Sequence, residues 1–572
     1  MRGIIYDVLT RVVNRARRLA LVVVCLVAAV AQARNVYITP DADGTGDGTS
    51  WSSPMMLTNY LVKAKANGDV VRLKAGKYTA QIAQQTFGNS MTIKISGGYA
   101  GTDDTTLDAE NPISDIDFAN YPTSGSYAPF LLKANSGYSM AFERLRLSRA
   151  RNVVFYKSTN AGDLYLSDCV IVSNGWRNYN GTGCYGGRGI HSEGGKLYMT
   201  NCVVAYNGMY SYPSTSPTSS YGDNGFGLYL KNTQTEMVGC KVYGNGSRIN
   251  LTSTEAASKI VRGGGKGMAV YATGSTKLMA IGCDFVCNKS PMGTYNSSTE
   301  SATGVGAGGT VAFDSATGSG AFSNCSFIAN MNVRDHSYGR YNLKFGGALA
   351  VNMSSPAKTV DVYNCTFAYN MTDSPGASAG LDAWNGTVNV RNSVFVGNSK
   401  PSTSSIGSDI HVRTGAVVNV SHTLFDAAGA DDARHFSTET IAEDSGTLNL
   451  GAGVVFGDAL LASATLASTN LIVNATKKIQ SATLPIAYYN TARIDEVLAF
   501  DIHPRSKAGR WTKSGYVIDT KQYSPAIDAA DPDCDVGLEP KPNGKRKNLG
   551  RYGGTAEASL TFEPSGTVIR LI

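Results

Sequence analysis

The chain has almost no excess of charge of either sign. It contains 51 Lys and Arg residues against 44 Asp and Glu residues, and the first 33 residues hold five of the arginines and Asp7. The remainder therefore has 46 basic and 43 acidic residues. So small a difference does not suit binding to the phosphates of nucleic acid. We expect no nucleic-acid partner.

Long apolar runs are also nearly absent, because only Leu19 to Val30 forms one. That run is too short to cross a bilayer as a helix. Five arginines accompany it, and Ala31-Gln32-Ala33 follows as a cleavage sequence of small residues. Residues 1–33 thus have the pattern of a signal peptide. We expect a secreted or cell-surface chain, monomeric, with no transmembrane span after cleavage.

A repeated phrase occupies the middle of the chain, and in it an Asn follows a Cys after five residues. The complete copies begin at Cys169, Cys202, Cys240, Cys283, Cys325 and Cys365. Ser393 with Asn398 makes a seventh copy, and a degenerate eighth surrounds Thr423. Successive steps are 33, 38, 43, 42, 40, 28 and 30 residues. A constant phrase with a variable period predicts a solenoid whose coils share a rigid part and differ in one loop.

Each phrase follows short segments in which apolar residues alternate with small or polar ones, as in residues 188–193 and 196–199. Alternation at period two indicates strands with one buried face. Three such strands per coil, separated by Gly or Asn turns, predict an all-β fold. We expect a right-handed parallel β-helix of about ten to twelve coils.

The repeated Cys and Asn positions predict columns inside this solenoid. The Cys column continues through Ser393 and Thr423, which favours buried free thiols over disulfides, although disulfides are the alternative. Cys184, Cys287 and Cys534 lie outside the column, and no pairing is assigned to them. The Asn is expected at a bend, either with a positive φ or bonded to its neighbour's backbone, as an internal amide ladder.

Two sets of motifs resemble known families. Phe327-x-x-Asn330 and its counterparts, with openings such as Gly346-Gly347-Ala348-Leu349, resemble the repeats of chlamydial polymorphic membrane proteins and related bacterial right-handed β-helix proteins. Residues 524–531 and 548–559 are similar to the closing segment of exported β-helix proteins with a choice-of-anchor type C-terminus. These resemblances imply fold and export, and no particular activity.

The resulting organisation has four parts. Residues 1–33 are the signal peptide, 34–110 an N-terminal cap with the first coils, 111–430 the repeats, and 431–572 the last coils with a C-terminal cap or anchor-like segment. A short helix at residues 57–64 has an apolar stripe. We expect it to cover the open end of the solenoid and its strand edges.

Motifs of known β-helix enzymes are lacking, since no Gly-His-Gly or paired-aspartate motif of pectin esterases occurs. Asp531, Asp533 and Asp535 resemble the start of a calcium loop, but Val536 and Pro542 stand where its Gly and Glu are needed. A turn is therefore the favoured interpretation. No cofactor is expected, with Ca²⁺ as the alternative.

Period-two alternation places two outward columns along the sheet that opens each coil. The first column is His191, Tyr229, Ala269, Ala312, Ala350, Asp382 and His411, and the second is Glu193, Lys231, Tyr271, Asp314, Asn352, Trp384 and Arg413. The small middle residues predict a shallow floor with exposed aromatic and charged groups towards its ends. We expect binding residues at Tyr229, Tyr271, Asp382, Trp384, His411 and Arg413.

A long, nearly neutral groove with aromatic groups predicts a glycan-binding or adhesin-like module, with a polysaccharide or cell-surface glycan as partner. The alternative is a polysaccharide lyase or glycosidase in the same groove, for which Arg188, His191, Tyr229 and Lys231 would supply a base and a cation. A structural surface protein is the third hypothesis. An ordinary solvated sheet explains the same residues without any site.

Overall fold

The computed structural model describes residues 33–41, 45–79, 85–88, 91–118, 129–133, 137–150, 153–160, 162–174, 188–208, 224–246, 266–292, 295–296, 301–302, 308–334, 346–372, 376–399, 408–426, 441–444, 446–463, 472–479, 482–489 and 491–563. Residues 1–32 of the predicted signal peptide, Cys184 and most of the variable loops between coils lie outside these residues.

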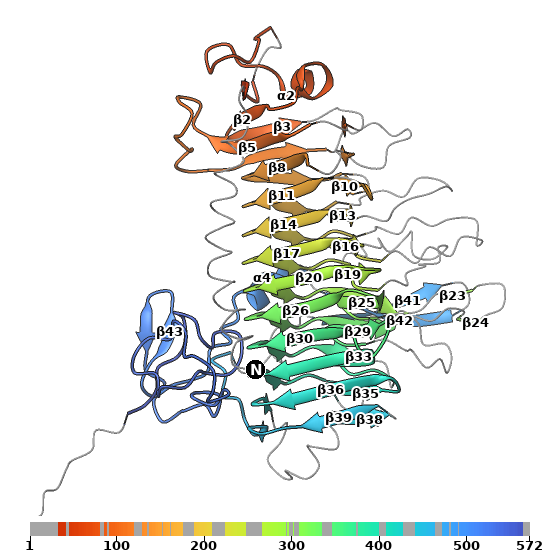
Figure 1. Ribbon diagram of the computed structural model, residues 1–572, viewed down its shortest axis with the longest axis vertical. Coiled ribbons are helices and arrows are strands. Elements are labelled where there is room, and N and C mark those ends of the chain that lie inside the picture. Colours follow the sequence, from red (N-terminus) through yellow and green to blue (C-terminus); the bar gives the residue numbers. More distant parts are fainter. Residues whose placement is uncertain are drawn as a thin grey trace, which may run out of the picture.

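The chain winds into a right-handed parallel β-helix built from three sheets, which we name S1, S2 and S3 in the order in which each coil visits them (Figure 1). S1 contains β4 (Gln85–Phe87), β7 (Phe130–Leu132), β10 (Phe155–Lys157), β13 (Ile190–Glu193), β16 (Leu228–Lys231), β19 (Val270–Thr273), β25 (Val311–Ala316), β29 (Leu349–Met353), the first half of β33 (Leu381–Arg391), β35 (Ile410–Arg413) and β38 (Ile441–Asp444).

S2 contains β1 (Asn35–Ile38), β2 (Val70–Lys74), β5 (Ile93–Tyr99), β8 (Ser139–Glu143), β11 (Asp163–Ser167), β14 (Lys196–Thr200), β17 (Gln234–Val238), β20 (Lys277–Ile281), β26 (Ser319–Ser323), β30 (Thr359–Tyr363), the second half of β33, β36 (Ala416–Ser421) and β39 (Thr447–Leu450).

S3 contains β3 (Gly76–Thr79), β6 (Ser114–Asp117), β9 (Leu145–Ser148), β12 (Val170–Val172), β15 (Val203–Ala205), β18 (Lys241–Tyr243), β21 (Asp284–Val286), β27 (Ser326–Ile328), β31 (Thr366–Ala368), β34 (Val394–Val396), β37 (Leu424–Phe425) and β40 (Val455–Phe456). Its 12 strands agree with the expected number of coils.

Smaller elements complete the described chain. They are the parallel strands β22 (Lys289–Met292), β28 (Met331–Arg334) and β32 (Met371–Thr372), the antiparallel pairs β23 (Tyr295–Asn296) with β24 (Ser301–Ala302), β41 (Ile472–Ile479) with β42 (Ala482–Tyr489), and β43 (Arg510–Thr512) with β44 (Gly515–Val517), and the helices α2 (Leu57–Asn59), η1 (Tyr60–Ala64) and α4 (Thr491–Leu498). No helix in the described part of the chain is both long and apolar enough to cross a membrane.

The repeated phrase forms the corners of each coil. The residue before the Cys turns the chain from S2 to S3 with a positive φ, as at Asn201, Asn324 and Gly282. Gly and Asn adopt this left-handed backbone at the lowest cost. The second positive φ falls on the residue before the repeated Asn, for example at Cys287 (φ 51°), so the part of the prediction that placed it on the Asn itself is wrong.

The repeated asparagines form the predicted internal ladder. Each Nδ2 donates to Oδ1 of the Asn on the next coil, at 2.9–3.1 Å from Asn174 to Asn398. The same Oδ1 also accepts the preceding Asn's backbone N–H, as Asn288 does from Asn245 at 3.1 Å. The Asn thus bonds to its neighbour's backbone, and every rung is satisfied inside the protein.

The Cys residues and the phenylalanines of the phrase make two further internal columns. All eight described cysteines are buried and free, so the ladder of thiols is confirmed for the six repeat positions. Phe327, Phe367 and Phe395 stack with ring centroids 4.5 and 4.6 Å apart. The solenoid therefore has one continuous apolar core.

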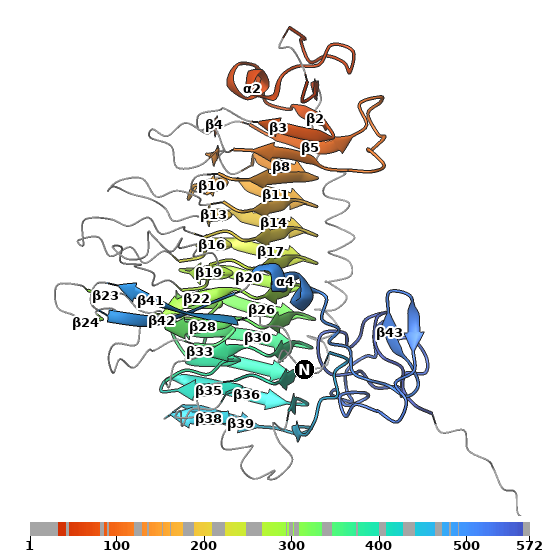
Figure 2. The same ribbon diagram turned by 180° about the vertical axis from the view of Figure 1, so that it is seen from behind.

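The two ends of the chain are placed differently. Leu57, Tyr60 and Leu61 of α2 and η1 are buried and join the core at the first coils, as expected for an N-terminal cap. The C-terminal segment from residue 491 lies against the side of the solenoid, over S3 and the corner between S2 and S3 (Figures 1 and 2). β38, β39 and β40 complete the last coil before that segment begins.

Candidate functional site

Apart from Ala269, which belongs to the interior cluster, the first outward column of S1 lies on the opposite side of the sheet from the core, as predicted. Leu228, Val311 and Leu349 belong to the interior cluster, whereas Ala312 and Ala350 form a separate cluster with Tyr271, Tyr229 and Trp384. We call this outer surface of S1 the S1 face.

The predicted register is wrong on one coil. Tyr271 pairs with Tyr229 and Ala312, so it stands in the first column, and Thr273 takes its place in the second. Val270, not Met268, is the inward residue that pairs with Leu228. Gly267, with φ +62°, stands three residues before Val270 as Gly225 stands three before Leu228, so Gly267 is the equivalent of Gly225 and not of Gly227. A shift of two residues preserves the faces, so alternation alone could not detect it.

Trp384 is also displaced from the predicted column. Val351 pairs with Ala383, but Asn352 pairs with Asn385, which leaves Trp384 as the extra residue of a register shift. Such an irregularity re-aims a side chain. The indole packs on the cluster of Tyr271, Ala312 and Ala350 and remains half-buried.

The four catalytic candidates from the sequence come together on coils β13 and β16. Arg188 Nη1 lies 3.0 Å from His191 Nδ1, and the guanidinium lies 4.4 Å over the Tyr229 ring. His191 Nε2 lies 2.9 Å from Glu193 Oε1, and Lys231 Nζ lies 3.9 Å from the same oxygen. Because Arg188 can only donate, Nδ1 of His191 accepts and Nε2 donates. Both ring nitrogens therefore already have partners.

Electrostatics keeps this imidazole neutral. Burial lowers the pKa of His191, the hydrogen bond to Glu193 offsets part of that shift, and the Arg188 charge adds to the lowering. The hydrogen bond from His191 lowers the pKa of Glu193 to about 2. Burial raises the pKa of Tyr229, so its hydroxyl stays protonated at neutral pH. A base role for His191 would require it to lose the Arg188 contact.

Aromatic rings extend this cluster along the solenoid. His191 stacks between Tyr156 and Tyr229 at centroid distances of 4.5 and 4.4 Å, and Tyr229 lies 5.3 Å from Tyr271. The rings face one another along the column, so they present mainly their edges and hydroxyl groups outward. This geometry differs from the expectation of freely exposed aromatic faces.

Asp314 organises the middle of the S1 face. Its carboxylate receives Tyr271 Oη at 2.9 Å, Lys266 Nζ at 2.7 Å and Asn352 Nδ2 at 3.3 Å. Asp314 and Asn352 belong to the predicted outward column, but Lys266, at the end of a variable loop, was not predicted to lie beside them. The available signal was a basic residue followed by Gly just before an S1 strand, as in Arg188-Gly189 and Lys266-Gly267.

Asp382 and His411, which are buried, form a second cluster with the half-buried Arg413 and Trp384. Arg413 donates to both oxygens of Asp382, at 2.9 and 3.0 Å, and its guanidinium lies 4.5 Å over the indole of Trp384. Burial alone would raise the pKa of Asp382, but Arg413 holds that pKa below its usual value. His411 Nδ1 lies 3.5 Å from Asp382 Oδ1, and neither ring nitrogen has a hydrogen-bond partner within the described residues.

The predicted open floor does not exist. Ala312 and Ala350 are 1% and 0% exposed, and His191, Tyr271, Asp382 and His411 are also buried. The backbone of Gly309 approaches so closely that a Cβ there would lie 2.5 Å from Ala350 Cβ. The alanines are small because the chain passes over them. The prediction that Trp384 and Tyr229 are fully exposed is also wrong, since both side chains are half-buried.

The accessible part of the S1 face is its second column, which we call the polar strip. It consists of Glu193, Lys231, Thr273, Asp314, Asn352 and Asn385, one residue on each of six successive coils. All six are half-buried, and Tyr229 and Trp384 lie beside the strip. It therefore presents carboxylate, ammonium, hydroxyl and amide groups at intervals of about 4.8 Å.

The calcium candidates are placed in turns. Asp531 Oδ1 accepts the N–H of Asp533 at 3.0 Å, and Asp535 Oδ1 accepts that of Gly537 at 3.0 Å. Asp531 also pairs with Arg391 at 3.4 Å. No group of three potential metal ligands occurs among the residues that the structure describes.

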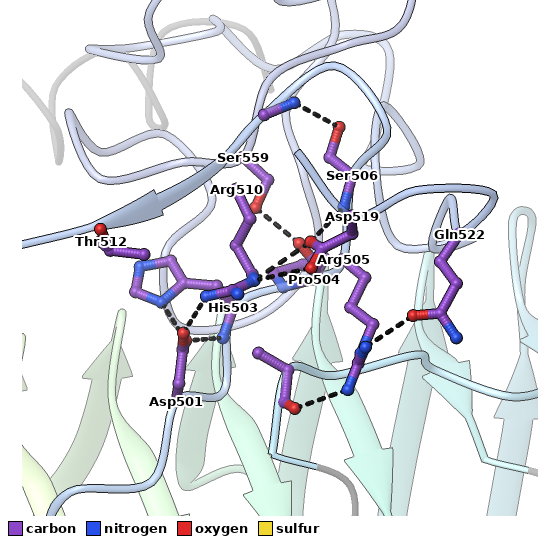
Figure 3. A network of polar contacts seen from close by, with 12 residues as sticks. Asp501, His503, Pro504, Arg505, Ser506, Arg510, Thr512, Asp519, Gln522 and Ser559 are labelled. Atoms are coloured by element: carbon purple, nitrogen blue, oxygen red, sulfur yellow. Dashed lines mark hydrogen bonds and ion pairs between the residues drawn. The ribbon is translucent and has the colours of Figure 1, made fainter. Parts of the chain in front are cut away.

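A further polar network lies in the C-terminal segment (Figure 3). Asp501 contacts His503 Nδ1 at 2.6 Å and forms an ion pair with Arg510, which also binds Asp519 at 3.1 Å. His503 stacks on Tyr552 at 3.5 Å. Ser506 and Ser559 donate to backbone carbonyls, so the network ties loops of this segment together.

These features define the chain as a parallel β-helix protein with a polar strip on its S1 face. No family model and no curated protein matches it. The crystal structure of pectate lyase Pel9A is similar at TM-score 0.44 and 15% identity, covering 91% of this chain and 97% of that one. A rhamnogalacturonan lyase is also similar, at TM-score 0.29 and 11% identity, covering 70% of this chain and 89% of that one. So is a tailspike of Acinetobacter phage vb_AbaP_AS12, at TM-score 0.29 and 11% identity, covering 80% of this chain and 65% of that one. Similarity at these TM-scores and identities does not locate a binding or catalytic site.

Proposed function

We propose that this chain is an exported, monomeric β-helix protein that binds a polysaccharide or cell-surface glycan along the S1 face. The observation that carries the proposal is the polar strip, because it offers one hydrogen-bonding side chain on each of six successive coils. A regularly spaced row of donors and acceptors matches a polymer of repeating hydroxylated units. The basic segment, apolar run and cleavage sequence within residues 1–33 support export.

Tyr229 and Trp384 are the aromatic groups best placed to contact such a polymer, since both are half-buried beside the strip. Tyr229→Ala and Trp384→Ala should each weaken glycan binding by about 1–3 kcal/mol, the scale for loss of an aromatic anchor. Binding is measured by calorimetry on polymers selected from a polysaccharide array. Tyr198→Ala is the matched control, because Tyr198 is also half-buried and stacked but lies on S2. Its ring centroid is 4.9 Å from that of Tyr165.

Three results would contradict the proposal. Release of unsaturated or reducing ends by the wild-type chain would indicate a lyase or glycosidase on the same face. Absence of binding to every polymer, together with ordered self-assembly, would indicate a structural protein. Equal losses of affinity in the S1 variants and in Tyr198→Ala would place the binding site elsewhere on the solenoid.

A further inference from the structure

The charges around the polar strip occur in pairs that join neighbouring coils. Lys231 Nζ lies 3.9 Å from Glu193 Oε1, and Lys266 Nζ lies 2.7 Å from Asp314 Oδ2. Arg413 binds both oxygens of Asp382. Each of the three carboxylates therefore faces a cation, and each pair carries no net charge.

Arg188 is the remaining described cation of this cluster, and it is committed to the protein. It is 6% exposed, and its Nε donates to the carbonyl of Asn224 at 2.8 Å. Its Nη1 lies 3.0 Å from His191 Nδ1, and the guanidinium lies over Tyr229. A ligand carboxylate cannot reach this cation without displacing those contacts.

Along the polar strip from Glu193 to Asn385, an acidic polymer therefore meets no uncompensated cation. A ligand carboxylate that approached Lys266 would meet Asp314 at the same site, and the repulsion from Asp314 would offset the attraction to Lys266. The same holds at Lys231 with Glu193 and at Arg413 with Asp382. Neutral hydroxyl groups carry no such penalty, and they can bond to Thr273, Asn352 and Asn385.

We infer that the S1 face is built for an uncharged polysaccharide and discriminates against polymers that carry a carboxylate on each sugar. This inference rests on the proposed function, because it names the ligand class of the same strip. It requires that affinity depends little on ionic strength, since no net charge is neutralised when the ligand binds.

The test compares polymers that differ only in charge. Polygalacturonate and alginate are each measured against their carboxyl-reduced forms, alongside neutral glucan, mannan, xylan and galactan. We expect the neutral or reduced polymers to bind at least about tenfold more tightly than the acidic ones. Their affinity should change less than about twofold between 0.05 and 0.5 M salt.

Substitution of one carboxylate should reverse the selectivity locally. Asp314→Asn keeps the side-chain shape and removes the carboxylate that pairs with Lys266. Binding of polygalacturonate at low salt should therefore rise at least about tenfold over wild type and fall again as salt screens the charge. Glu193→Gln should act in the same way through Lys231. Asp163→Asn, at a half-buried position on S2, is the control. It should change the affinity for neither the acidic nor the neutral polymers.

The outcomes separate the inference from the function. Preference of the wild-type chain for the acidic polymers with steep salt dependence overturns the inference, while binding on the S1 face stands. No increase in Asp314→Asn and Glu193→Gln, both folded by circular dichroism, also overturns it. Failure of every polymer to bind overturns the proposed function itself.

Discussion

At the scale of single residues, the asparagine ladder shows how one repeated amide can hold a solenoid together. Asn288 donates to Asn330 Oδ1 at 3.1 Å and to the carbonyl of Val242 at 2.9 Å, while its own Oδ1 accepts from Asn245. Asn288 is fully buried, so water cannot replace these bonds. Its amide therefore links three successive coils.

Asn288→Ala should lower the free energy of unfolding by about 3 kcal/mol or more, because several buried groups lose their partner together. Asn449→Ala provides the control, since Asn449 belongs to an exposed amide row on S2 and bonds to Asn419 at 2.8 Å. There we expect a change within about 0.5 kcal/mol. Denaturant unfolding measures both, and comparable losses would show that burial of the ladder is unimportant.

The internal ladder ends at an unusual carboxyl group. Asn398 Nδ2 donates to Asp409 Oδ1 at 2.7 Å, and Asp409 is buried. Burial, with a smaller contribution from Asp426, raises the pKa of Asp409 to about 8. The folded protein thus keeps this proton at a pH at which the unfolded chain releases it.

This arrangement predicts a pH dependence of stability. Between pH 4 and pH 8 the folded state binds more protons at Asp409 than the unfolded state, so the contribution of Asp409 to the free energy of unfolding falls as pH rises, by at most about 1.4 kcal/mol per pH unit. Asp409→Asn should match wild type near pH 4 and exceed its stability near pH 8. Thermal unfolding across that range tests this, with the exposed Asp458→Asn as control. Parallel pH profiles for wild type and Asp409→Asn would refute the assignment.

At the scale of elements, the C-terminal segment is held to the solenoid by hydrogen bonds to residues at the corners between S2 and S3. Asn324 Nδ2 donates to the carbonyls of Arg551 and Gly553, and Asn364 Nδ2 donates to that of Asn548. Arg551 reaches Asp284 at 3.1 Å and the carbonyl of Gly282 at 3.0 Å. Beside these contacts, α4 buries Ile494 and Val497 on the outer side of S3.

Removing the arginine anchor should loosen this segment selectively. Arg551→Ala leaves Asp284 without its cation, and we expect the docking to weaken by about 2 kcal/mol or more. Hydrogen exchange should then show faster exchange in α4 and residues 524–562 while strands of S2 keep their protection. Arg493→Ala, which breaks only an exposed pair with Glu496, is the control. Uniform loss of protection along the solenoid would contradict local docking.

At the scale of the whole molecule, the buried free thiols indicate that the core of the solenoid is stable without disulfides. The described cysteines are buried without partners in disulfides, and burial raises the pKa of Cys287 well above its usual value. A parallel β-helix of twelve coils buries a long continuous core, which removes the need for covalent links.

Alkylation followed by mass spectrometry tests this state. The eight described cysteines should resist iodoacetamide in the native protein, because their buried thiols are inaccessible to the reagent. All eight should react in denaturant without a reductant. Resistance that disappears only after reduction would reveal a disulfide and contradict the ladder of free thiols.

Much of this architecture was predictable from local patterns. The Cys-x₄-Asn phrase predicted the coils and their internal columns, and period-two alternation placed Leu228 inward and Tyr229 outward. The docking of the C-terminal segment had a weaker signal, because Val394-Phe395-Val396 is apolar on both faces and thus predicts a covered outer surface. The position of Tyr271 had none, since a two-residue offset leaves the alternation unchanged.

The sequence by itself determined the solenoid, because each repeat carries its own turn residues, buried amide and inward side chains, and these interactions are local to neighbouring coils. Only the tertiary structure decided which groups of the S1 face are accessible. Gly309 passes over Ala350, and Lys266 reaches Asp314 from the end of a loop of variable length. Such contacts depend on where a loop returns to the sheet, and a repeat pattern does not encode that path.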